Sequence, residues 1–164
     1  MAGIGGLGHL GVQYAKVLGA KVIAIDNRKE GIDTALSTEK KVIKELQSSF
    51  YDSNTGVDRV IINTEVRNLI KFSRQFLRKG GILVDVGLPS EWPLEVDPFA
   101  LSFKEKTVKG RLIYTPDQSQ DMINLHEKHR CNTHIEKTYG VEQINEMYEH
   151  YQKKDLRGRL CMVF

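Results

Sequence analysis

The chain opens with closely spaced glycines, in the order Gly3-Ile4-Gly5-Gly6-Leu7-Gly8, and this run constrains the fold more than any other feature. It satisfies the pattern G-x-G-x-x-G, in which the first glycine permits a tight turn, the second lets the backbone approach a ligand and the third lets a helix pack on a strand. Apolar residues at helical spacing follow, namely Leu7, Leu10, Tyr14 and Leu18. We predict a turn that opens a helix, with the helix N-terminus facing an anion such as a phosphate.

An acidic residue follows the glycine turn at the distance expected of a dinucleotide-binding site. Residues 21–26 form a short apolar run rich in β-branched residues that ends at Asp26, as is typical of a buried parallel strand. An acid in this place accepts hydrogen bonds from adenosine ribose hydroxyls and repels a 2′-phosphate. The pattern predicts a dinucleotide site with NAD as the first choice, and Arg28 leaves NADP open. The alternatives are glycines that only shape a turn and a solvated surface arginine.

Strand and helix patterns alternate along the rest of the chain. Apolar runs predict strands over residues 57–62, 82–87, 106–113 and 159–164, and a short extended stretch over 134–137. Helical spacing predicts helices over residues 42–50, 66–77 and 141–151, the second of them ending in a left-handed cap at Gly80-Gly81. Thr115-Pro116-Asp117-Gln118 combines a threonine N-cap, a proline and a glutamine, and so predicts a helix start. We expect an α/β fold with a mainly parallel sheet.

Composition excludes several classes of protein. A chain of 164 residues favours one compact unit, and 24 basic against 21 acidic residues are spread too evenly to indicate a nucleic-acid or membrane surface. The two cysteines, Cys131 and Cys161, form no disulfide framework, which favours the cytosol. The apolar residues 1–25 resemble a signal peptide or membrane anchor, but their glycines and lysines favour the phosphate-binding turn.

Beyond its glycines, the sequence resembles the zinc-dependent alcohol dehydrogenases of the medium-chain dehydrogenase/reductase family. The segment Gly3-Ile-Gly-Gly-Leu-Gly-His-Leu-Gly-Val-Gln-Tyr-Ala-Lys16 is similar to the coenzyme-binding segment of that family. Further matches are Gly56-Val-Asp58, Leu77-Arg-Lys-Gly-Gly-Ile-Leu-Val84 leading into Gly87, Phe103-Lys-Glu105 before Val108-Lys-Gly110, and Gly158-Arg159-Leu160. The resemblance implies a Rossmann-type doubly wound parallel sheet in residues 1–130, and a segment 131–164 that returns to the catalytic domain in the family.

The resemblance also implies roles for individual residues. Gly3, Gly5, Gly6, Leu7 and Gly8 would hold the pyrophosphate and Asp26 the adenosine ribose. Four residues would lie near the nicotinamide: Val86, Gly87, Leu88 and Ile113. Arg159 would match a phosphate-binding arginine, and a surface arginine at a strand start is the equal alternative.

The chain departs from the family in what precedes the glycine loop. The family places there a domain with Cys/His zinc ligands and a proton relay, so we expect the zinc site to be missing and this chain alone to be inactive. The first strand is reduced to Met1 and Ala2, and the third is lost or vestigial near residues 31–33, as in a degenerate gene copy or an incomplete gene model. The sheet is therefore expected to be incomplete, with an open edge through which a homo-oligomer would form.

Three readings of function remain open. The first is the coenzyme-binding part of an NAD(P)-dependent alcohol dehydrogenase-like enzyme, which transfers hydride between an alcohol or aldehyde and nicotinamide. The second is an inactive remnant that serves as a nucleotide-binding or interaction module. The third is a subunit that a separate catalytic-domain chain completes.

Other residues that bear chemistry have ordinary structural explanations. His126 and His129 share an apolar helical stripe with Met122 and Leu125, so packing is favoured over a metal site with Cys131 and His134. Asp85 lies within a strand and is expected to pair or cap. Trp92 is expected to anchor a loop.

Overall fold

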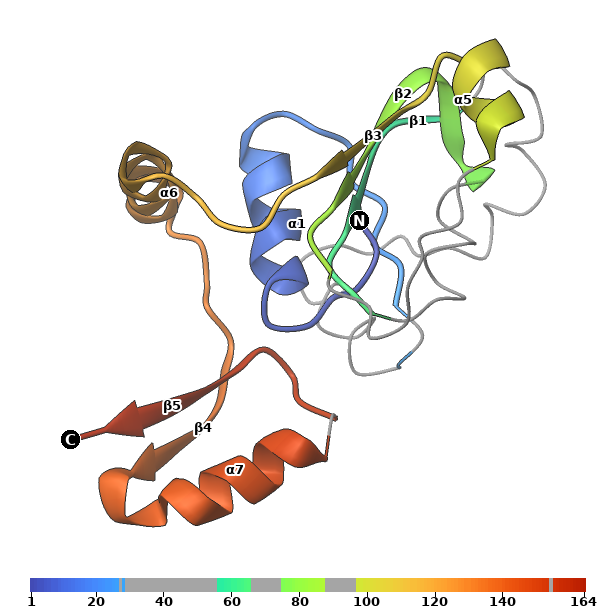
Figure 1. Cartoon of the computed structure of the whole chain (residues 1–164). Helices are drawn as coiled ribbons and strands as arrows, with labels where there is room; N and C mark the ends of the chain where they lie inside the picture. Colours follow the sequence, from blue (N-terminus) through green and yellow to red (C-terminus); the bar gives the residue numbers. More distant parts are fainter. Residues whose placement is uncertain (27, 29–55, 66–74, 88–96, 154) are drawn as a thin grey trace.

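A parallel sheet forms the centre of the computed structural model, which describes residues 1–26, 28, 56–65, 75–87, 97–153 and 155–164. The sheet has the order β1-β2-β3, with β1 at Val57–Ile62, β2 at Leu77–Asp85 and β3 at Thr107–Gly110. Both neighbouring pairs are parallel, as the alternation of strand and helix predicted (Figure 1). β1 has the predicted bounds, whereas β3 is shorter than the predicted strand over 106–113.

Residues 1–3 extend this sheet beyond β1. Ala2 forms parallel bridges with Ile25 on one side and Ile62 on the other. The N–H of Gly3 donates to the Ile25 carbonyl at 2.8 Å, and the N–H of Asn63 donates to the Ala2 carbonyl at 2.8 Å. The order is therefore residues 21–26, residues 1–3, β1, β2 and β3, which is the 2-1-4-5-6 part of a doubly wound sheet. The predicted Rossmann-type α/β fold is confirmed.

The predicted strand over 21–26 is reduced to one bridge at Ile25. Among the described residues, this segment pairs only with residues 1–3, and a ladder cannot be longer than the segment it pairs with. The predicted helix over 42–50, the vestigial strand near 31–33 and Trp92 lie outside the described residues, as does most of the predicted helix over 66–77.

The predicted end of that helix at Gly80-Gly81 is wrong. Leu77 begins β2 and pairs with Val57, so both glycines lie inside a strand that starts five residues before the predicted one. Gly80 does have the left-handed φ of +69° expected of a cap, but its N–H donates to the Lys104 carbonyl at 2.9 Å. A buried place for Leu77 in the core, available only in the folded sheet, decided the extended conformation.

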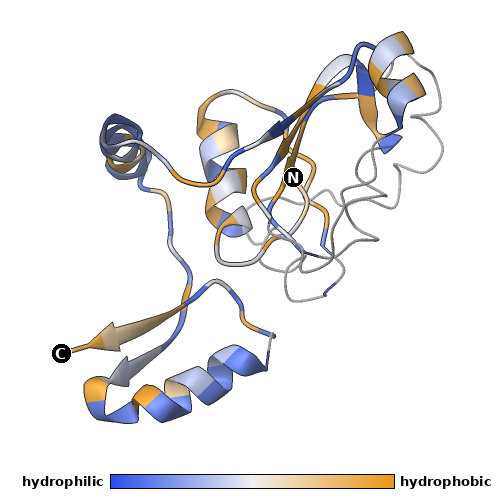
Figure 2. Cartoon of the chain, in the orientation of Figure 1, coloured by the Kyte–Doolittle hydropathy of each residue, from blue (hydrophilic) through white to orange (hydrophobic). Residues whose placement is uncertain are grey.

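The core lies where residues 1–3 meet the neighbouring strands. Its buried side chains are Ala2, Ile25, Val60, Ile62, Leu77 and Leu83. Helix α1 (Gly8–Val17), which was predicted after the glycines, buries Val12 against Ile4. Apolar residues accordingly concentrate along β1 and β2 (Figure 2).

Further helices and a second, smaller sheet make up the rest of the described residues. Helix α5 (Pro98–Phe103) was not predicted, although Asp97 accepts the Phe99 N–H and Pro98 follows it, which is a helix-start signature. Helix α6 (Pro116–His129) begins with the predicted capping box, in which Thr115 and Gln118 bond reciprocally. None of the described helices is both long and apolar enough to cross a membrane.

Strand β4 (Ile135–Gly140) pairs in parallel with β5 (Arg159–Val163), and η1 (Val141–Gln143) and α7 (Ile144–Gln152) connect them. The predicted extended stretch, helix and closing strand are thus confirmed. In Figure 1 this second sheet stands apart from the first, and the chain enters it after α6. Tyr139 is buried beneath α7, and its hydroxyl lies 2.6 Å from Nδ1 of His150.

Candidate functional site

All strands of the larger sheet run in parallel, so their carboxyl ends meet at one edge. The glycine loop follows residues 1–3 at this edge, and Asp26 ends the neighbouring segment. Val86 and Gly87 follow β2 there, and the Arg111 N–H donates to the Asp85 carbonyl at 2.8 Å. Ligands of doubly wound proteins bind outside this edge, where the strand order reverses.

The outer glycines of the loop are structural. Gly3 has φ +84°, and a Cβ there would meet Thr64 and the Asn63 carbonyl at 2.8–2.9 Å. A Cβ on Gly8 would overlap the Gly3 carbonyl oxygen, so Gly8 lets α1 begin directly against the turn. Both glycines have the roles that the motif predicted.

Gly5 and Leu7 are accessible residues of the inner part of the loop. Among the described residues, a Cβ on Gly5 would meet only Nη2 of Arg28, at 3.7 Å, and Leu7 is exposed. Among the described residues, the N–H groups of Gly5, Gly6 and Leu7 have no hydrogen-bond acceptor. Unbonded amides at a helix N-terminus attract an anion, because the helix dipole adds to their partial positive charge.

Asp26 is tied to the loop rather than open to solvent. Its Oδ2 accepts the Ile4 N–H at 2.7 Å, and its Oδ1 accepts the N–H of Arg28 at 2.9 Å and Nε of Arg28 at 3.3 Å. The side chain is 3% exposed, against 30% for Arg28. The carboxylate therefore shapes the loop and aligns Arg28, whose guanidinium is the more accessible group.

A second arginine reaches the loop from the far end of the chain. Nε of Arg159 would lie 3.2 Å from a Cβ on Gly6, which places the guanidinium arm against the loop. The Arg159 N–H donates to the His134 carbonyl at 2.9 Å. Two guanidinium groups, those of Arg28 and Arg159, thus flank the unbonded amides.

His9 is a residue of the site that sequence reasoning did not single out. Its side chain is buried, Nδ1 lies 2.9 Å from the Gly5 carbonyl oxygen, and Nε2 accepts the His134 N–H at 3.3 Å. Burial lowers the pKa of His9, and the charges of Arg159 and His134 lower it further. The signal available in the sequence was a histidine directly after the last glycine of the motif.

The structure describes three of the four residues expected near a nicotinamide. The N–H groups of Val86 and Gly87 donate to the Ile62 carbonyl at 2.9 and 3.1 Å, and a Cβ on Gly87 would overlap the Thr64 carbonyl. Ile113 follows β3 and is 70% exposed. Leu88 lies outside the described residues.

Asp85 was expected to pair or cap, and the structure bears this out for only part of its carboxylate. Its Oδ1 is buried and has no hydrogen-bond partner among the described residues. Burial raises the pKa of this carboxyl, although a hydrogen bond from the Gly87 N–H partly offsets the effect.

The histidines and cysteine near the end of α6 do not converge on a metal. Nδ1 of His126 lies 2.9 Å from the Tyr14 hydroxyl, so this histidine contacts α1, whereas His129 is exposed. Among the residues that the structure describes, no group of three or more His, Cys, Asp or Glu side chains is arranged to hold a metal ion. This donor set does not fit zinc.

Residues 6–128 match the family model described as zinc-binding dehydrogenase. The chain is 30% identical to an alcohol dehydrogenase of Geobacillus stearothermophilus over 98% of its own length and 48% of that protein. It superposes on an alcohol dehydrogenase from Aeropyrum pernix with a TM-score of 0.83 at 22% identity, over 99% of this chain and 48% of that one. It also superposes on acetophenone reductase from Geotrichum candidum in complex with NAD, with a TM-score of 0.81 at 22% identity, over 99% and 47%. The chain thus spans about half the length of the proteins it resembles.

Proposed function

The chain belongs to the zinc-binding dehydrogenase family, and from this membership we propose that it is the coenzyme-binding part of an NAD(P)-dependent alcohol dehydrogenase-like oxidoreductase. The observation that carries the proposal is a group of three amides, on Gly5, Gly6 and Leu7, that have no acceptor among the described residues and lie between two guanidinium groups. This arrangement offers a dinucleotide pyrophosphate both hydrogen-bond donors and positive charge.

Different described residues would contact different parts of the dinucleotide. The inner amides and Arg159 would hold the pyrophosphate. Gly5 would let the backbone approach the phosphates, since Arg28 is the only described residue near the position of its missing Cβ. Val86, Gly87 and Ile113 would lie towards the nicotinamide end, together with Leu88. A bound nicotinamide would supply the ring that accepts hydride from an alcohol.

NAD remains the first choice of cofactor, because a carboxylate at Asp26 opposes a 2′-phosphate. Arg28 favours the alternative cofactor, NADP, since its guanidinium can bind a phosphate and is more exposed than the Asp26 carboxylate it pairs with. We therefore propose that NAD binds more tightly than NADP, by a margin that Arg28 reduces.

The described His and Cys side chains are not grouped in a way that could hold zinc, so the proposal contains no catalytic step on that metal. The alternative function is a nucleotide-binding module without turnover of its own. The two proposals share the binding step and differ in alcohol-dependent NAD reduction by the purified chain. Appearance of NADH with ethanol or a benzylic alcohol, abolished by a chelator, would favour the enzyme.

The binding step is tested by calorimetric titration with NAD and NADP. Gly5→Val fills space that is open in the structure, so this variant should fold and yet block the phosphates. Gly110→Ala on β3 is the matched control, because no described residue other than its chain neighbours has an atom within 4 Å of the added Cβ. We expect NAD binding by the wild type and the control and at least a tenfold loss in Gly5→Val, about 1.4 kcal/mol. Unchanged binding by Gly5→Val would refute the proposed site.

A further inference from the structure

His9 lies between the two parts of the chain that build the anion site. It stands in the first turn of α1, and its side chain is 4% exposed. One ring nitrogen faces the glycine loop and the other faces the segment before β4. A ligand cannot reach so buried a ring, so any effect of His9 on binding must pass through its neighbours.

The two hydrogen bonds of His9 determine its tautomer. The His134 N–H donates to Nε2, so Nε2 carries no proton. Nδ1 therefore carries the proton and donates it to the Gly5 carbonyl. Both bonds exist together only in the neutral ring.

The charged groups around the ring favour the same state. His134 faces it from the segment before β4 and Arg159 from the start of β5, and each of these opposes a positive His9. The glycine loop contributes the Gly5 carbonyl, which favours the charged ring, but burial has the larger effect. The folded structure therefore favours the neutral form of His9.

The contacts continue from His9 to Arg159. His134, whose N–H binds His9, also accepts the Arg159 N–H with its carbonyl oxygen at 2.9 Å. Gly158 precedes Arg159 with φ +82°, and a Cβ there would overlap that carbonyl. The Arg159 side chain then lies against Gly6. A closed ring of contacts results, running from Gly5 through His9, His134 and Arg159 back to Gly6.

A second pair of bonds holds the same two segments together. Nε2 of Gln13 donates to the Asn132 carbonyl at 2.9 Å, and the Asn132 N–H donates to Oε1 of Gln13 at 2.8 Å. Gln13 is one helical turn beyond His9 and exposed to solvent at this contact. The segment 132–134 thus remains attached to α1 when His9 alone is replaced, which makes a His9 variant a local change.

We infer that His9 is a positioning residue that holds Arg159 over the glycine loop, and that dinucleotide affinity depends on its neutral ring. The inference rests on the proposed function, because it assigns Arg159 to the pyrophosphate. Protonation of Nε2 removes its capacity to accept the His134 N–H and places a positive charge beside Arg159. The arginine is then released from the position in which it faces the loop.

The test is a double-mutant cycle on the full chain, with NAD binding measured by calorimetry for the wild type, His9→Leu, Arg159→Ala and the double variant. We expect each single variant to bind NAD about tenfold more weakly, and the double variant to bind no more weakly than Arg159→Ala. His129→Leu is the matched control, because it removes an exposed histidine from α6. Losses that multiply in the double variant, or wild-type affinity in His9→Leu, would overturn the inference.

A conservative variant adds a readout that a purely structural role would not affect. Gln keeps a side-chain acceptor for the His134 N–H but does not titrate, so His9→Gln should retain NAD affinity. Because the fold lowers the pKa of His9 below the usual imidazole value of about 6.5, wild-type affinity should fall as the pH drops below that value, and His9→Gln affinity should not. Parallel pH profiles would contradict the role of the neutral ring. Absence of NAD and NADP binding by the wild type would instead overturn the proposed function, and this inference with it.

Discussion

The Ile4 N–H of the glycine loop donates to Oδ2 of Asp26 at 2.7 Å, across 22 residues of sequence. This bond joins the two features from which the dinucleotide site was predicted, and it gives Asp26 a structural role in addition to any contact with a ribose. The same carboxylate accepts two bonds from Arg28. A change at Asp26 is therefore expected to alter stability and cofactor preference together.

Asp26→Ser should lower the free energy of unfolding by about 1–3 kcal/mol, because it removes the carboxylate that accepts the Ile4 N–H and two bonds from Arg28. It should also weaken NAD roughly tenfold and improve NADP relative to NAD, since the negative charge that opposes a 2′-phosphate is gone. Urea denaturation and calorimetry measure the two effects. Asp121→Ser, on an exposed face of α6, is the control. An unchanged ratio of NAD to NADP affinity would remove Asp26 and Arg28 from the cofactor site.

Gly8→Ala should destabilise the fold, whereas Gly5→Ala should not. The added methyl group overlaps the Gly3 carbonyl in the first case and meets only Arg28, at 3.7 Å, in the second. Overpacking of this kind costs about 1–3 kcal/mol. Urea denaturation compares the two variants, and equal midpoints would show that the tight turn between Gly3 and Gly8 is absent in solution.

The stability of the chain should fall as the pH drops below about 6.5, in part because of His9. Its pKa is lowered in the fold, so the unfolded chain binds more protons in this range and the neutral-ring stability is lost as the pH falls. Thermal unfolding at a series of pH values measures the slope. His9→Gln should show a smaller slope than the wild type, and an identical slope would assign the acid sensitivity to other groups.

Asp85→Asn should raise the free energy of unfolding by about 1 kcal/mol near neutral pH, because the ionised form has a buried oxygen without a partner. The pKa of Asp85 is raised in the fold, so ionisation opposes folding and stability declines as the pH rises through that pKa. The gain should therefore shrink as the pH approaches about 4. Denaturation at the two pH values measures it, with Asp121→Asn as the control. A variant less stable than the wild type at neutral pH would contradict this account.

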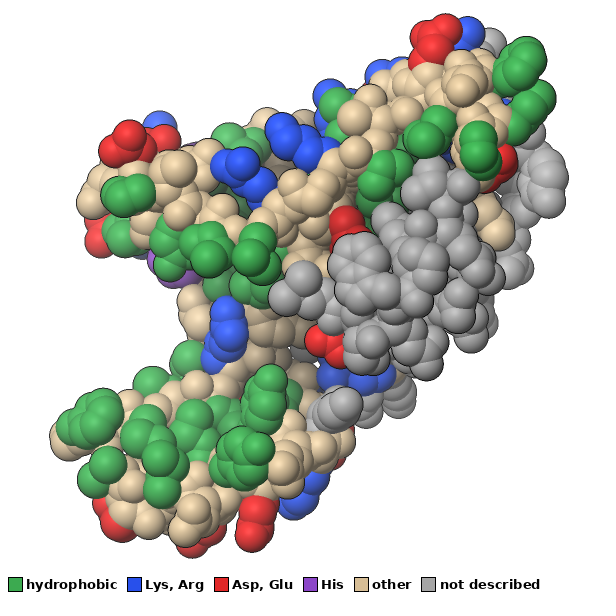
Figure 3. Space-filling model, viewed as in Figure 1, with side chains coloured by type: hydrophobic (Ala, Val, Ile, Leu, Met, Phe, Trp, Pro, Cys, Tyr) green, Lys and Arg blue, Asp and Glu red, His purple; other side chains and the backbone are tan. Residues whose placement is uncertain are grey.

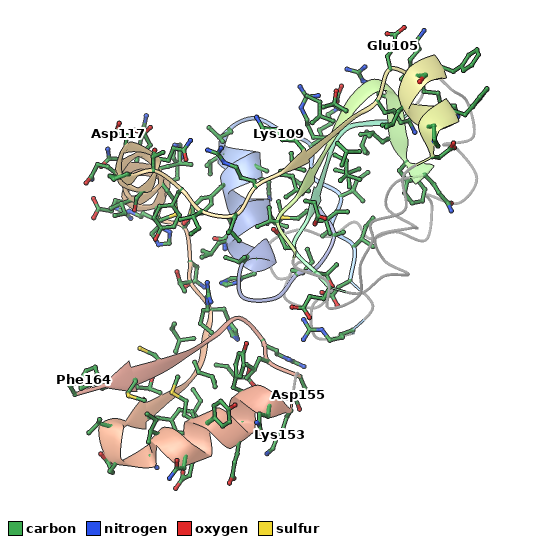
Figure 4. The ribbon with its side chains drawn as sticks, in the orientation of Figure 1. Glu105, Lys109, Asp117, Lys153, Asp155 and Phe164 are labelled. Atoms are coloured by element: carbon green, nitrogen blue, oxygen red, sulfur yellow. The ribbon has the colours of Figure 1, made fainter. Side chains whose placement is uncertain are left out.

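The sheet of β4 and β5 should exchange its amide hydrogens faster than β1 and β2. It has two strands among the described residues, and no residue of α6 or α7 is itself buried. Apolar side chains lie exposed over this part of the chain, as Figure 3 shows, and Phe164 at the end of β5 is 99% exposed (Figure 4). A two-stranded sheet is marginal in water. Hydrogen exchange followed by mass spectrometry compares the segments, and equal protection would indicate that another surface covers this sheet in solution.

Elements that depend on interactions between residues close in sequence formed where they were predicted. The capping box of Thr115 and Gln118 forms between residues three apart, and α6 begins where it was predicted. β1 has its predicted bounds because Val60 and Ile62, from the apolar end of the segment, are buried in the sheet, and β1 has neighbours on both sides. The predicted apolar stripe of α6 is narrower in the structure, since Leu125 and His126 are half-buried whereas Met122 and His129 are exposed.

The sequence by itself determined the glycine turn, the helix that follows it and the strand pattern, because these depend on backbone sterics and on periodicity within a few residues. The tertiary structure alone decided that Leu77 begins a strand, that His9 bonds to His134 and that Arg159 lies against Gly6. Each of these three results needs a partner from a distant part of the chain. The partner supplies a buried surface or a hydrogen bond only once the fold has brought it near, and no local pattern encodes that energy.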